Sequence, residues 1–312
     1  MKNIRNTDLN LLVAFDALMA ERSVTKAGER IGLTQPSMSN ALARLRSLFD
    51  DELFVRSPEG MTPTAVAMEA AAHIKASIYA AEEALNVNVG AFKPEDAEGA
   101  ITLLTNDLIE FTILPNIIRA MGQQAPKLRL RTRPLIKEAF EQELDTGLSD
   151  FAIAAPVEVP KRFGYNDLFD EPFDGIARIG HPILSGTITV EEFFAYKHVA
   201  VSHRFGATGL IEKAVSNFDR TLDIAVSVSN IASVPPLVSM TDFISVVPRR
   251  LATIGAREEL IAKFDLPFEI PSVSAKLIWG RGADRSPMSS WFRNLVVDIT
   301  IRNKTGAFAH GE

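Results

Sequence analysis

Apolar residues recur at helical spacing from the start of the sequence to about residue 90. The first stripe has members three and four residues apart, as the buried face of an amphipathic helix requires; it consists of Leu11, Leu12, Phe15, Leu18 and Met19. Asp8 precedes this stripe and belongs to a residue type that caps helices. The pattern therefore predicts a first helix that is buried along one face.

Two further helices are predicted, separated by a short glycine-containing turn. The first covers residues 24–31 and starts at Ser23 or Thr25. Thr34 can cap the second, and Pro36 suits its first turn. The buried stripe of the second helix steps by 4, 3 and 4 residues through Met38, Leu42, Leu45 and Phe49. Two helices joined by such a turn, and preceded by another helix, form a helix-turn-helix pattern.

A small β-hairpin is expected directly after these helices. Residues 53–56 and 61–62 flank Ser57-Pro58-Glu59-Gly60, a stretch rich in turn-forming residues. We expect the two flanking stretches to pair and to form a wing beside the helix-turn-helix.

A long helix is predicted from Pro63 to about Val89, since neither proline nor glycine interrupts this segment. Its apolar positions alternate steps of 4 and 3 residues: Ala67, Ala71, Ile74, Ile78, Ala81 and Leu85. A seam of about three heptads is typical of helices that pair in coiled coils. The alternative is an amphipathic helix packed on its own domain. The seam, the length and the alanine content favour pairing with a second copy.

The rest of the chain alternates short apolar runs with helical patterns. It follows a polar, breaker-rich linker, residues 93–99. Strands are expected at 101–105, 128–132, 151–155, 198–202, 224–228, 243–247 and 276–279, and helices at 108–121, 137–144, 190–195, 209–218, 231–240 and 287–301. Such alternation predicts an α/β domain with mostly parallel sheets and helices on both faces.

The charge of the chain is unevenly distributed. Lys and Arg number 33 against 39 Asp and Glu, a formal net charge of −6, which taken whole argues against a nucleic-acid-binding protein. Residues 1–60, however, hold eight basic and eight acidic groups, and residues 22–46 hold five basic groups and one acid. A solvated helix face gives the same count. The surplus nevertheless lies where a phosphate backbone would be contacted.

Composition excludes several classes of protein and site. With 46% hydrophobic and 23% charged residues the chain is not generally disordered, and with no cysteine it has no disulfide, thiolate metal site or cysteine nucleophile. The five histidines lack metal-ligand spacing, so we expect neither a metal site nor a cofactor. The sequence shows no signal peptide and no membrane span, because Asp16 interrupts the first apolar stretch. We therefore expect a cytoplasmic protein.

The amino-terminal part resembles the winged helix-turn-helix of LysR-type transcriptional regulators. Over roughly 60 residues the resemblance rests on Asp8-Leu9-Asn10-Leu11-Leu12, Ser23-Val24-Thr25-Lys26-Ala27, Leu33-Thr34-Gln35-Pro36-Ser37-Met38-Ser39, Leu42, Arg44-Leu45, Leu53-Phe54-Val55-Arg56 and Thr62-Pro63-Thr64. Gly28 departs from the alanine usual in the family, at a cost of about 0.5–1 kcal/mol in helix propensity. The remainder is similar to the family in length, in strand–helix order, and in Gly147-Leu148-Ser149-Asp150-Phe151-Ala152-Ile153 and His181-Pro182.

The resemblance implies three parts. These are a winged helix-turn-helix DNA-binding domain (1–62), a linker and dimerisation helix (63–90), and a two-lobed, periplasmic-binding-protein-like α/β effector-binding domain (97–312). Lobe I would hold about 97–168 and 272–312, and lobe II about 169–271, with chain crossings near 168–173 and 268–272. The family also implies a homodimer through the linker helix, a homotetramer on bent promoter DNA, and contact with RNA polymerase.

The resemblance also implies which residues contact DNA. The third helix would lie in the major groove with its amino end nearest the bases, where Gln35, Ser37 and Asn40 carry groups that read base edges. Arg44 would reach a guanine or a phosphate, while the groups on the second helix and the wing would hold phosphates. Helix capping alone also explains Ser23 and Thr34, and Arg44 also fits a solvated surface position. The candidate contacts are Ser23, Thr25, Lys26, Thr34, Gln35, Pro36, Ser37, Asn40, Arg44 and Arg56.

An effector is expected between the lobes, where strand ends meet helix amino termini. Hydroxyl, amide and imidazole groups there can bind a carboxylate or a phenol, and phenylalanines can form apolar walls. The candidates are Thr105, Asn106, Phe111, Phe173, Ser202, His203 and Phe205. His203 also fits a loop histidine and Phe111 a core residue. Asp107, at the same helix start, would repel an anion unless it only caps the helix.

The function implied is an effector-gated, sequence-specific transcriptional regulator. Asp8-Leu9-Asn10-Leu11-Leu12, Pro235-Pro236-Leu237 and Val247-Pro248-Arg249-Arg250-Leu251 most resemble the branch of nodulation regulators and regulators of naphthalene and nitroaromatic breakdown, which implies an aromatic compound or a small organic acid as effector. One alternative is a constitutive DNA-binding regulator without a ligand. The other is an α/β enzyme joined to a DNA-binding head, but the chain has no G-x-S-x-G, P-loop or G-x-G-x-x-G motif. We therefore expect no enzyme.

Overall fold

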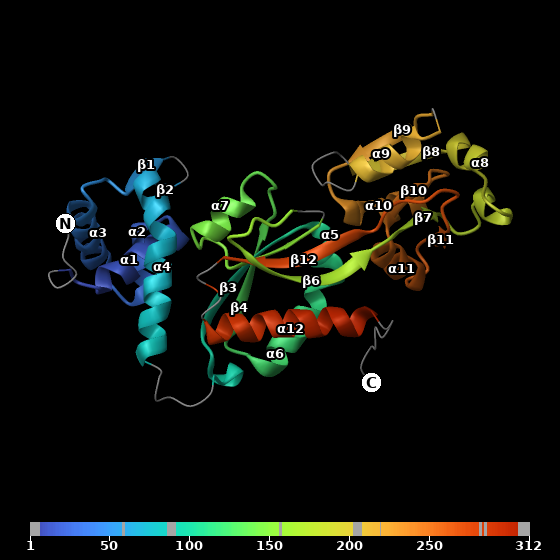
Figure 1. Ribbon diagram of the computed structural model, residues 1–312. Helices are drawn as coiled ribbons and strands as arrows, with labels where there is room; N and C mark the ends of the chain where they lie inside the picture. Colours follow the sequence, from blue (N-terminus) through green and yellow to red (C-terminus); the bar gives the residue numbers. More distant parts are fainter. Residues whose placement is uncertain are drawn as a thin grey trace.

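The chain forms three parts in a row (Figure 1). The structure is a computed structural model that describes residues 7–57, 60–85, 92–155, 158–201, 208–218, 220–280, 283 and 286–304. A small helical part, residues 10–63, which we call the reader, lies at one end, and a long helix, α4 (Ala65–Leu85), runs along the side of it that faces the two α/β lobes.

The reader contains α1 (Asn10–Glu21), α2 (Val24–Ile31), α3 (Gln35–Phe49) and the hairpin β1 (Phe54–Ser57) with β2 (Gly60–Pro63). The caps expected at Ser23 and Thr34 are confirmed, since the side chain of Ser23 accepts from the Lys26 amide and that of Thr34 from the Ser37 amide. The cap expected at Asp8 is wrong: Leu9 is the N-cap of α1, and Asp8 accepts from the Asn10 amide in the first position of the helix. The expected wing is confirmed as well, since β1 and β2 pair antiparallel.

The core of the reader gathers around Phe15, which is 1% exposed. Its ring centroid lies 6.1 Å from that of Phe49 on α3 and 5.5 Å from that of Phe54 on the wing. The first seam positions of α4, Ala67, Ala71 and Ile74, are buried in the same core. The alternative interpretation of the seam, packing on its own domain, therefore holds for this half of the helix.

Lobe I is built on a five-stranded sheet in the order β4-β3-β5-β12-β6. Its helices α6 and α12 lie along one face (Figure 1), and Phe151 and Phe292 are fully buried where α12 meets the sheet. Its elements are η2 (Pro94–Asp96), β3 (Gly99–Thr105), α5 (Asp107–Thr112), α6 (Leu114–Gln124), β4 (Leu128–Pro134), α7 (Phe140–Asp145), β5 (Phe151–Ala154), β6 (Gly164–Glu171), β12 (Val273–Trp279) and α12 (Pro287–Lys304).

Lobe II combines a three-stranded sheet, β10-β7-β11, with the pair β8-β9, joined by one bridge between His198 and Ile244. Its core holds Ile176, Val199 and Val247. Its elements are β7 (Phe173–Ala177), η3 (Pro182–Ser185), α8 (Val190–Ala195), β8 (Lys197–Val201), α9 (Thr208–Ser216), β9 (Asp223–Val228), η5 (Ile231–Ser233), α10 (Val234–Ser239), β10 (Ser245–Pro248), α11 (Arg249–Arg257) and β11 (Ala262–Phe264).

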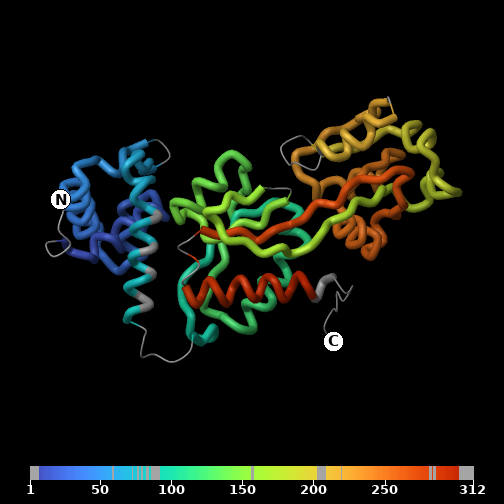
Figure 2. Tube along the Cα trace, viewed as in Figure 1, coloured from blue at the N-terminus to red at the C-terminus, as the bar shows by residue number. Residues whose placement is uncertain are grey.

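The expectation of mostly parallel sheets is wrong. Pairs β3–β4, β3–β5 and β8–β9 are parallel, but β12 runs antiparallel to β5 and β6, and β7 antiparallel to β10 and β11. The cause is the double passage of the chain between the lobes, which Figure 2 shows. It leaves lobe I through β6 and Pro172 into β7 and returns into β12, so the outgoing and returning strands run in opposite directions.

Two other differences have local causes. The single helix expected over 108–121 is divided at Ile113, because Pro115 favours the start of a new helix there. Strand β6 was not predicted, since its polar residues, Tyr165 to Asp167 and Asp170, break the apolar run. None of the helices within the described ranges is long and apolar enough to cross a membrane.

Candidate nucleic-acid interface and effector site

One face of α3 is polar and exposed. Ser37, Asn40 and Arg44 are exposed on the side away from the buried residues of the helix, and Gln35 is exposed in its first turn. The groups at its amino end also contact one another: the Thr34 and Ser37 hydroxyls lie 2.9 Å apart, and Gln35 Nε2 donates to Ser39 Oγ at 3.2 Å. The helix thus presents a row of hydrogen-bonding groups on the surface of the reader.

Arg44 is held at the edge of this row by an acid from the segment that precedes α1. Its Nη2 lies 3.0 Å from Asp8 Oδ2. The pKa of Asp8 is lowered by the bond from the Asn10 amide first and by Arg44 next. To bind a phosphate or a base, Arg44 must exchange this exposed carboxylate for the DNA.

The other predicted contacts lie on α2, in the first turn of α3 and on the wing. Thr25 and Lys26 are exposed on α2, Pro36 is exposed in the first turn of α3, and Arg56 is exposed on β1. Ser23 is partly buried as the cap of α2. All of these except Ser23 are thus exposed on the surface of the reader.

Two of the five basic side chains counted in residues 22–46 have partners inside the reader. Arg30 pairs with Glu21 at 3.1 Å. Arg46 donates to the carbonyl oxygens of Glu52 and Phe54 at 2.9 and 2.8 Å, which ties α3 to the wing. Arg46 is thus a structural residue, although the charge count grouped it with the others.

A cavity of about 110 Å³ lies where the lobes meet. For comparison, a dry engineered cavity of about 150 Å³ binds benzene. Most of its wall is apolar, and its polar side chains include Asp107, Glu171 and His198. The described residues that line it are Asn106, Asp107, Leu108, Ile109, Ile153, Ala154, Ala155, Phe169, Glu171, Phe173, His198, Val199, Ala200, Val201, Ile211, Glu212, Leu222, Ile224, Ile231, Val246, Pro248, Val273 and Ala275.

The predicted effector residues divide into three groups. Asn106 and Phe173 line the cavity, and the Asn106 side chain also caps α5 by accepting from the Ile109 amide at 3.1 Å. Thr105 is buried beside it, and Phe111 is 44% exposed; neither belongs to the cavity wall. Ser202, His203 and Phe205 lie outside the described residues.

Asp107 joins the two lobes at the edge of the cavity. Its Oδ2 accepts from the amide of Ala232, on η5 of lobe II, at 3.4 Å. Leu108 next to it packs against the lobe II core. The sequence placed Asp107 at a helix start, but only the fold shows that its partner comes from the other lobe.

A buried ion pair fixes the crossing strand beside the cavity. Glu171, at the end of β6, lies 2.7 Å from Arg250 Nε and accepts from the Arg250 amide at 2.9 Å. The Arg250 guanidinium also lies 3.9 Å above the ring of Phe169. Burial raises the pKa of Glu171, while the Arg250 contacts oppose that shift. Sequence reasoning missed this pair, because Arg250 lies 79 positions further along the chain.

His198 gives lobe II a predictable response to acid. Burial lowers its pKa to about 4 from 6.5, so between these values the unfolded chain binds a proton that the folded chain does not. Lowering the pH from 7 to 5 should therefore cost lobe II about 2 kcal/mol of unfolding free energy. The measurement is urea denaturation at both pH values, followed by circular dichroism at 222 nm.

The variant His198→Leu should lose most of this pH dependence. His73→Leu, which alters an exposed histidine on α4, serves as the control and should keep it. If the unfolding free energy changed equally with pH in wild type and in His198→Leu, the pH dependence could not be assigned to His198.

The described residues contain no group of three or more histidine and carboxylate side chains placed to hold a metal ion. Two of the acids in the cavity wall bond to the protein itself. Asp107 accepts from the Ala232 amide, and Glu171 pairs with Arg250.

Comparison with known proteins matches nearly the whole chain. The LysR substrate binding domain matches residues 94–299, and the bacterial regulatory helix-turn-helix protein, lysR family, matches residues 9–68. The HTH-type transcriptional regulator SyrM of Rhizobium etli is 31% identical over 313 residues, which cover 98% of this chain and 89% of SyrM. The HTH-type transcriptional activator NahR of Pseudomonas putida is 29% identical over 296 residues, covering 95% and 98%. Among solved structures, the probable transcriptional regulator PA0477 of Pseudomonas aeruginosa superimposes with a TM-score of 0.67 at 29% identity, covering 94% of this chain and 97% of that one.

Proposed function

Because the chain belongs to the LysR family of DNA-binding transcriptional regulators, we propose that α3 reads promoter DNA through its exposed polar face and that the cavity between the lobes holds the effector. The observation that supports the first part is the row formed by Ser37, Asn40 and Arg44 opposite the buried face of α3, with Gln35 exposed in its first turn. Amide and hydroxyl groups discriminate base edges in the major groove. The relatives are regulators, not enzymes, and an enzyme activity is not proposed.

The surrounding groups set the register of the reader on the duplex. Thr25, Lys26 and Arg56 contact phosphates, and Ser23 and Thr34 present the amide groups of the two helix starts that they cap. Pro36 fixes the first turn of α3. Such contacts carry affinity but little sequence information, so replacing Lys26 should weaken binding similarly on all sequences.

The proposed effector is a small aromatic compound of about one ring. This follows from the cavity volume and its mainly apolar wall, to which Phe173 and Phe169 contribute rings. Asn106 is the amide that would bind a hydroxyl or carboxylate substituent. The carboxylate of Asp107 favours a hydroxyl, since like charges repel an acid.

Thermal denaturation of the full chain with one-ring phenols and one-ring aromatic acids tests this, with and without promoter DNA. A ligand of the folded state raises the melting temperature with concentration, and we expect the phenols to do so more than the acids. If no compound of either kind raises it, the constitutive regulator without a ligand becomes the better account.

We also propose that the chain forms a homodimer through α4. The second half of its seam is only partly covered within the described chain: Ile78 packs at the edge of the reader core, whereas Ala81 is exposed and Leu85 is 81% exposed. A second α4 would cover these positions by coiled-coil packing. Two dimers would then form a tetramer that bends the promoter and contacts RNA polymerase in the cytoplasm, with lobe closure on the effector altering that contact.

The variant Leu85→Asp should weaken this dimer, because it places a charge in the seam. We expect the dimer dissociation constant to rise by at least about tenfold, which corresponds to the loss of one buried leucine or about 1.5–3 kcal/mol. Analytical ultracentrifugation of the full chain measures it. Ser77→Asp, at an exposed position outside the seam, is the control. Equal dissociation constants for the two variants would contradict the proposal that the seam of α4 is the dimer interface.

A further inference from the structure

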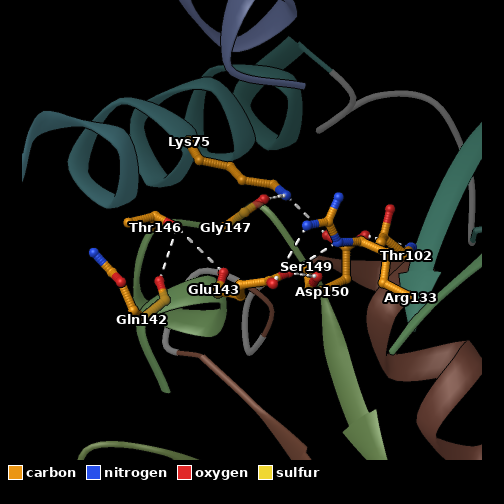
Figure 3. A network of polar contacts seen from close by, with 9 residues as sticks. All are labelled: Lys75, Thr102, Arg133, Gln142, Glu143, Thr146, Gly147, Ser149 and Asp150. Atoms are coloured by element: carbon orange, nitrogen blue, oxygen red, sulfur yellow. Dashed lines mark hydrogen bonds and ion pairs between the residues drawn. The ribbon is translucent and has the colours of Figure 1, made fainter. Parts of the chain in front are cut away.

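A lysine of α4 connects the reader to lobe I. Lys75 lies on α4, and its side chain extends to the loop between α7 and β5 (Figure 3). There Nζ donates to the carbonyl oxygen of Gly147 and pairs with Asp150 Oδ1 at 2.9 Å. The two charged side chains are only 20% and 12% exposed, so water screens this pair less than it screens the exposed pairs of the surface.

The loop is shaped to receive this lysine. Gly147 has a φ of +65°, a left-handed conformation that favours glycine, and a Cβ at this position would overlap Lys75 Cδ. Around the loop, Ser149 Oγ donates to Glu143 Oε2 at 2.8 Å, and Arg133 Nε donates to the same oxygen at 3.0 Å. The stretch Gly147-Leu148-Ser149-Asp150 therefore contacts Lys75 of α4. Neither the fold of lobe I nor promoter recognition accounts for this contact.

Asp150 also bonds to a strand that leads to the cavity. Its Oδ2 accepts from the Thr102 amide on β3 at 2.8 Å, and its own amide donates to the Thr102 carbonyl at 2.9 Å. Asp150 is directly followed by β5. Strand β3 ends beside Asn106 and β5 ends at Ala154, and both residues line the cavity. The lysine thus contacts the residue that precedes β5 and that bonds to the middle of β3, and both strands end at the cavity wall.

Lys75 is not required by the core of the reader. The buried face of α4 packs through Ala67, Ala71 and Ile74. A second, more exposed contact between the two parts runs from Arg131 on β4 to Glu21 on α1 at 3.7 Å. The contact of Lys75 is therefore the shorter and less exposed of the two, and it joins two parts that each have their own core.

We propose that Lys75 is a positioning residue: its contacts with Asp150 and Gly147 hold the reader and α4 in one orientation on lobe I and link that orientation to the strands of the effector cavity. This rests on the proposed function, since only a chain with a reader and an effector cavity has an orientation to transmit. Without the charge at position 75, the reader changes orientation on the lobe while both parts remain folded.

The test measures the orientation directly in the full chain. Because the sequence contains no cysteine, Ser47→Cys on α3 and Gln123→Cys on α6, both exposed, provide two sites for spin labels. Dilution with unlabelled protein restricts the measured distance to one chain. Lys75→Met removes the charge but keeps the length of the side chain, and Lys127→Met, whose partners Asp96 and Glu98 lie beside it in the same part of the fold, is the control.

We expect one narrow distance distribution in wild type and in Lys127→Met, and at least a doubling of its width in Lys75→Met with an unchanged melting temperature. Operator affinity should fall about threefold or more in Lys75→Met, because the readers must then be ordered on binding. A Lys75→Met distribution equal to wild type, equal broadening in Lys127→Met, or unchanged operator affinity would each overturn the proposal. The distance measurement uses neither DNA nor effector, so its failure is distinct from a failure of promoter recognition.

Discussion

Replacing Arg44 by alanine should lower the affinity of the full chain for its operator by about 5- to 150-fold, or about 1–3 kcal/mol. Arg44 is exposed at the edge of the polar face of α3, and its partner in the free protein is the exposed carboxylate of Asp8. An exposed ion pair of this kind contributes little to stability, so the fold should be unaffected. The loss is expected in binding alone and is measured by titration of labelled operator at several salt concentrations.

Salt dependence separates the two roles open to Arg44. A phosphate contact would reduce the salt slope by about one, whereas a base contact would relax specificity at one position. The matched control is Arg129→Ala, an exposed arginine on β4. Unchanged affinity in Arg44→Ala, or an equal loss in both variants, would refute the assignment of this face of α3 to DNA.

Replacing Phe15 by alanine should destabilise the reader by about 3–5 kcal/mol. The ring is 1% exposed and lies between α1, α3 and the wing, against Phe49 and Phe54. The chain has two tryptophans, Trp279 and Trp291, both in elements of lobe I. Tryptophan fluorescence thus reports on lobe I, while circular dichroism at 222 nm also reports on the reader helices.

In a urea titration, the Phe15→Ala chain should lose part of its helical signal at a lower urea concentration than wild type while the fluorescence midpoint stays unchanged. Val13→Ala, on the same helix but 41% exposed, should have a much smaller effect. A single transition that shifts equally by both probes would mean that the reader does not unfold as a unit of its own.

The reader could be predicted closely because its signals are local. Each signal acts over a few residues: caps such as Ser23 and Thr34, apolar stripes at helical spacing, and a turn rich in glycine and proline. Gly28 is an instructive exception. The sequence gives only its propensity cost, whereas in the structure a Cβ there would lie 2.8 Å from the Leu33 carbonyl oxygen, so the glycine permits the close turn between the helices.

The effector domain was predicted less well because its decisive contacts are distant in sequence. Asp107 meets Ala232 across 125 positions, and Lys75 meets Asp150 across 75. Neither pair belongs to a repeating pattern. The antiparallel course of β12 depends in the same way on where the chain crosses between lobes, which no local periodicity records. Asn106 and Phe173 were predicted because both flank segment ends that the family resemblance placed at the cleft.

Nuclease footprinting of the full chain on the promoter regions beside its own gene tests the central claim most directly. We expect two protected half-sites related by a two-fold axis, with centres separated by one helical turn, about 34–36 Å, or a multiple of it. Protection should weaken in Arg44→Ala and persist in Arg129→Ala. Uniform protection without discrete half-sites, or a footprint that Arg44→Ala leaves unchanged, would contradict promoter reading by α3.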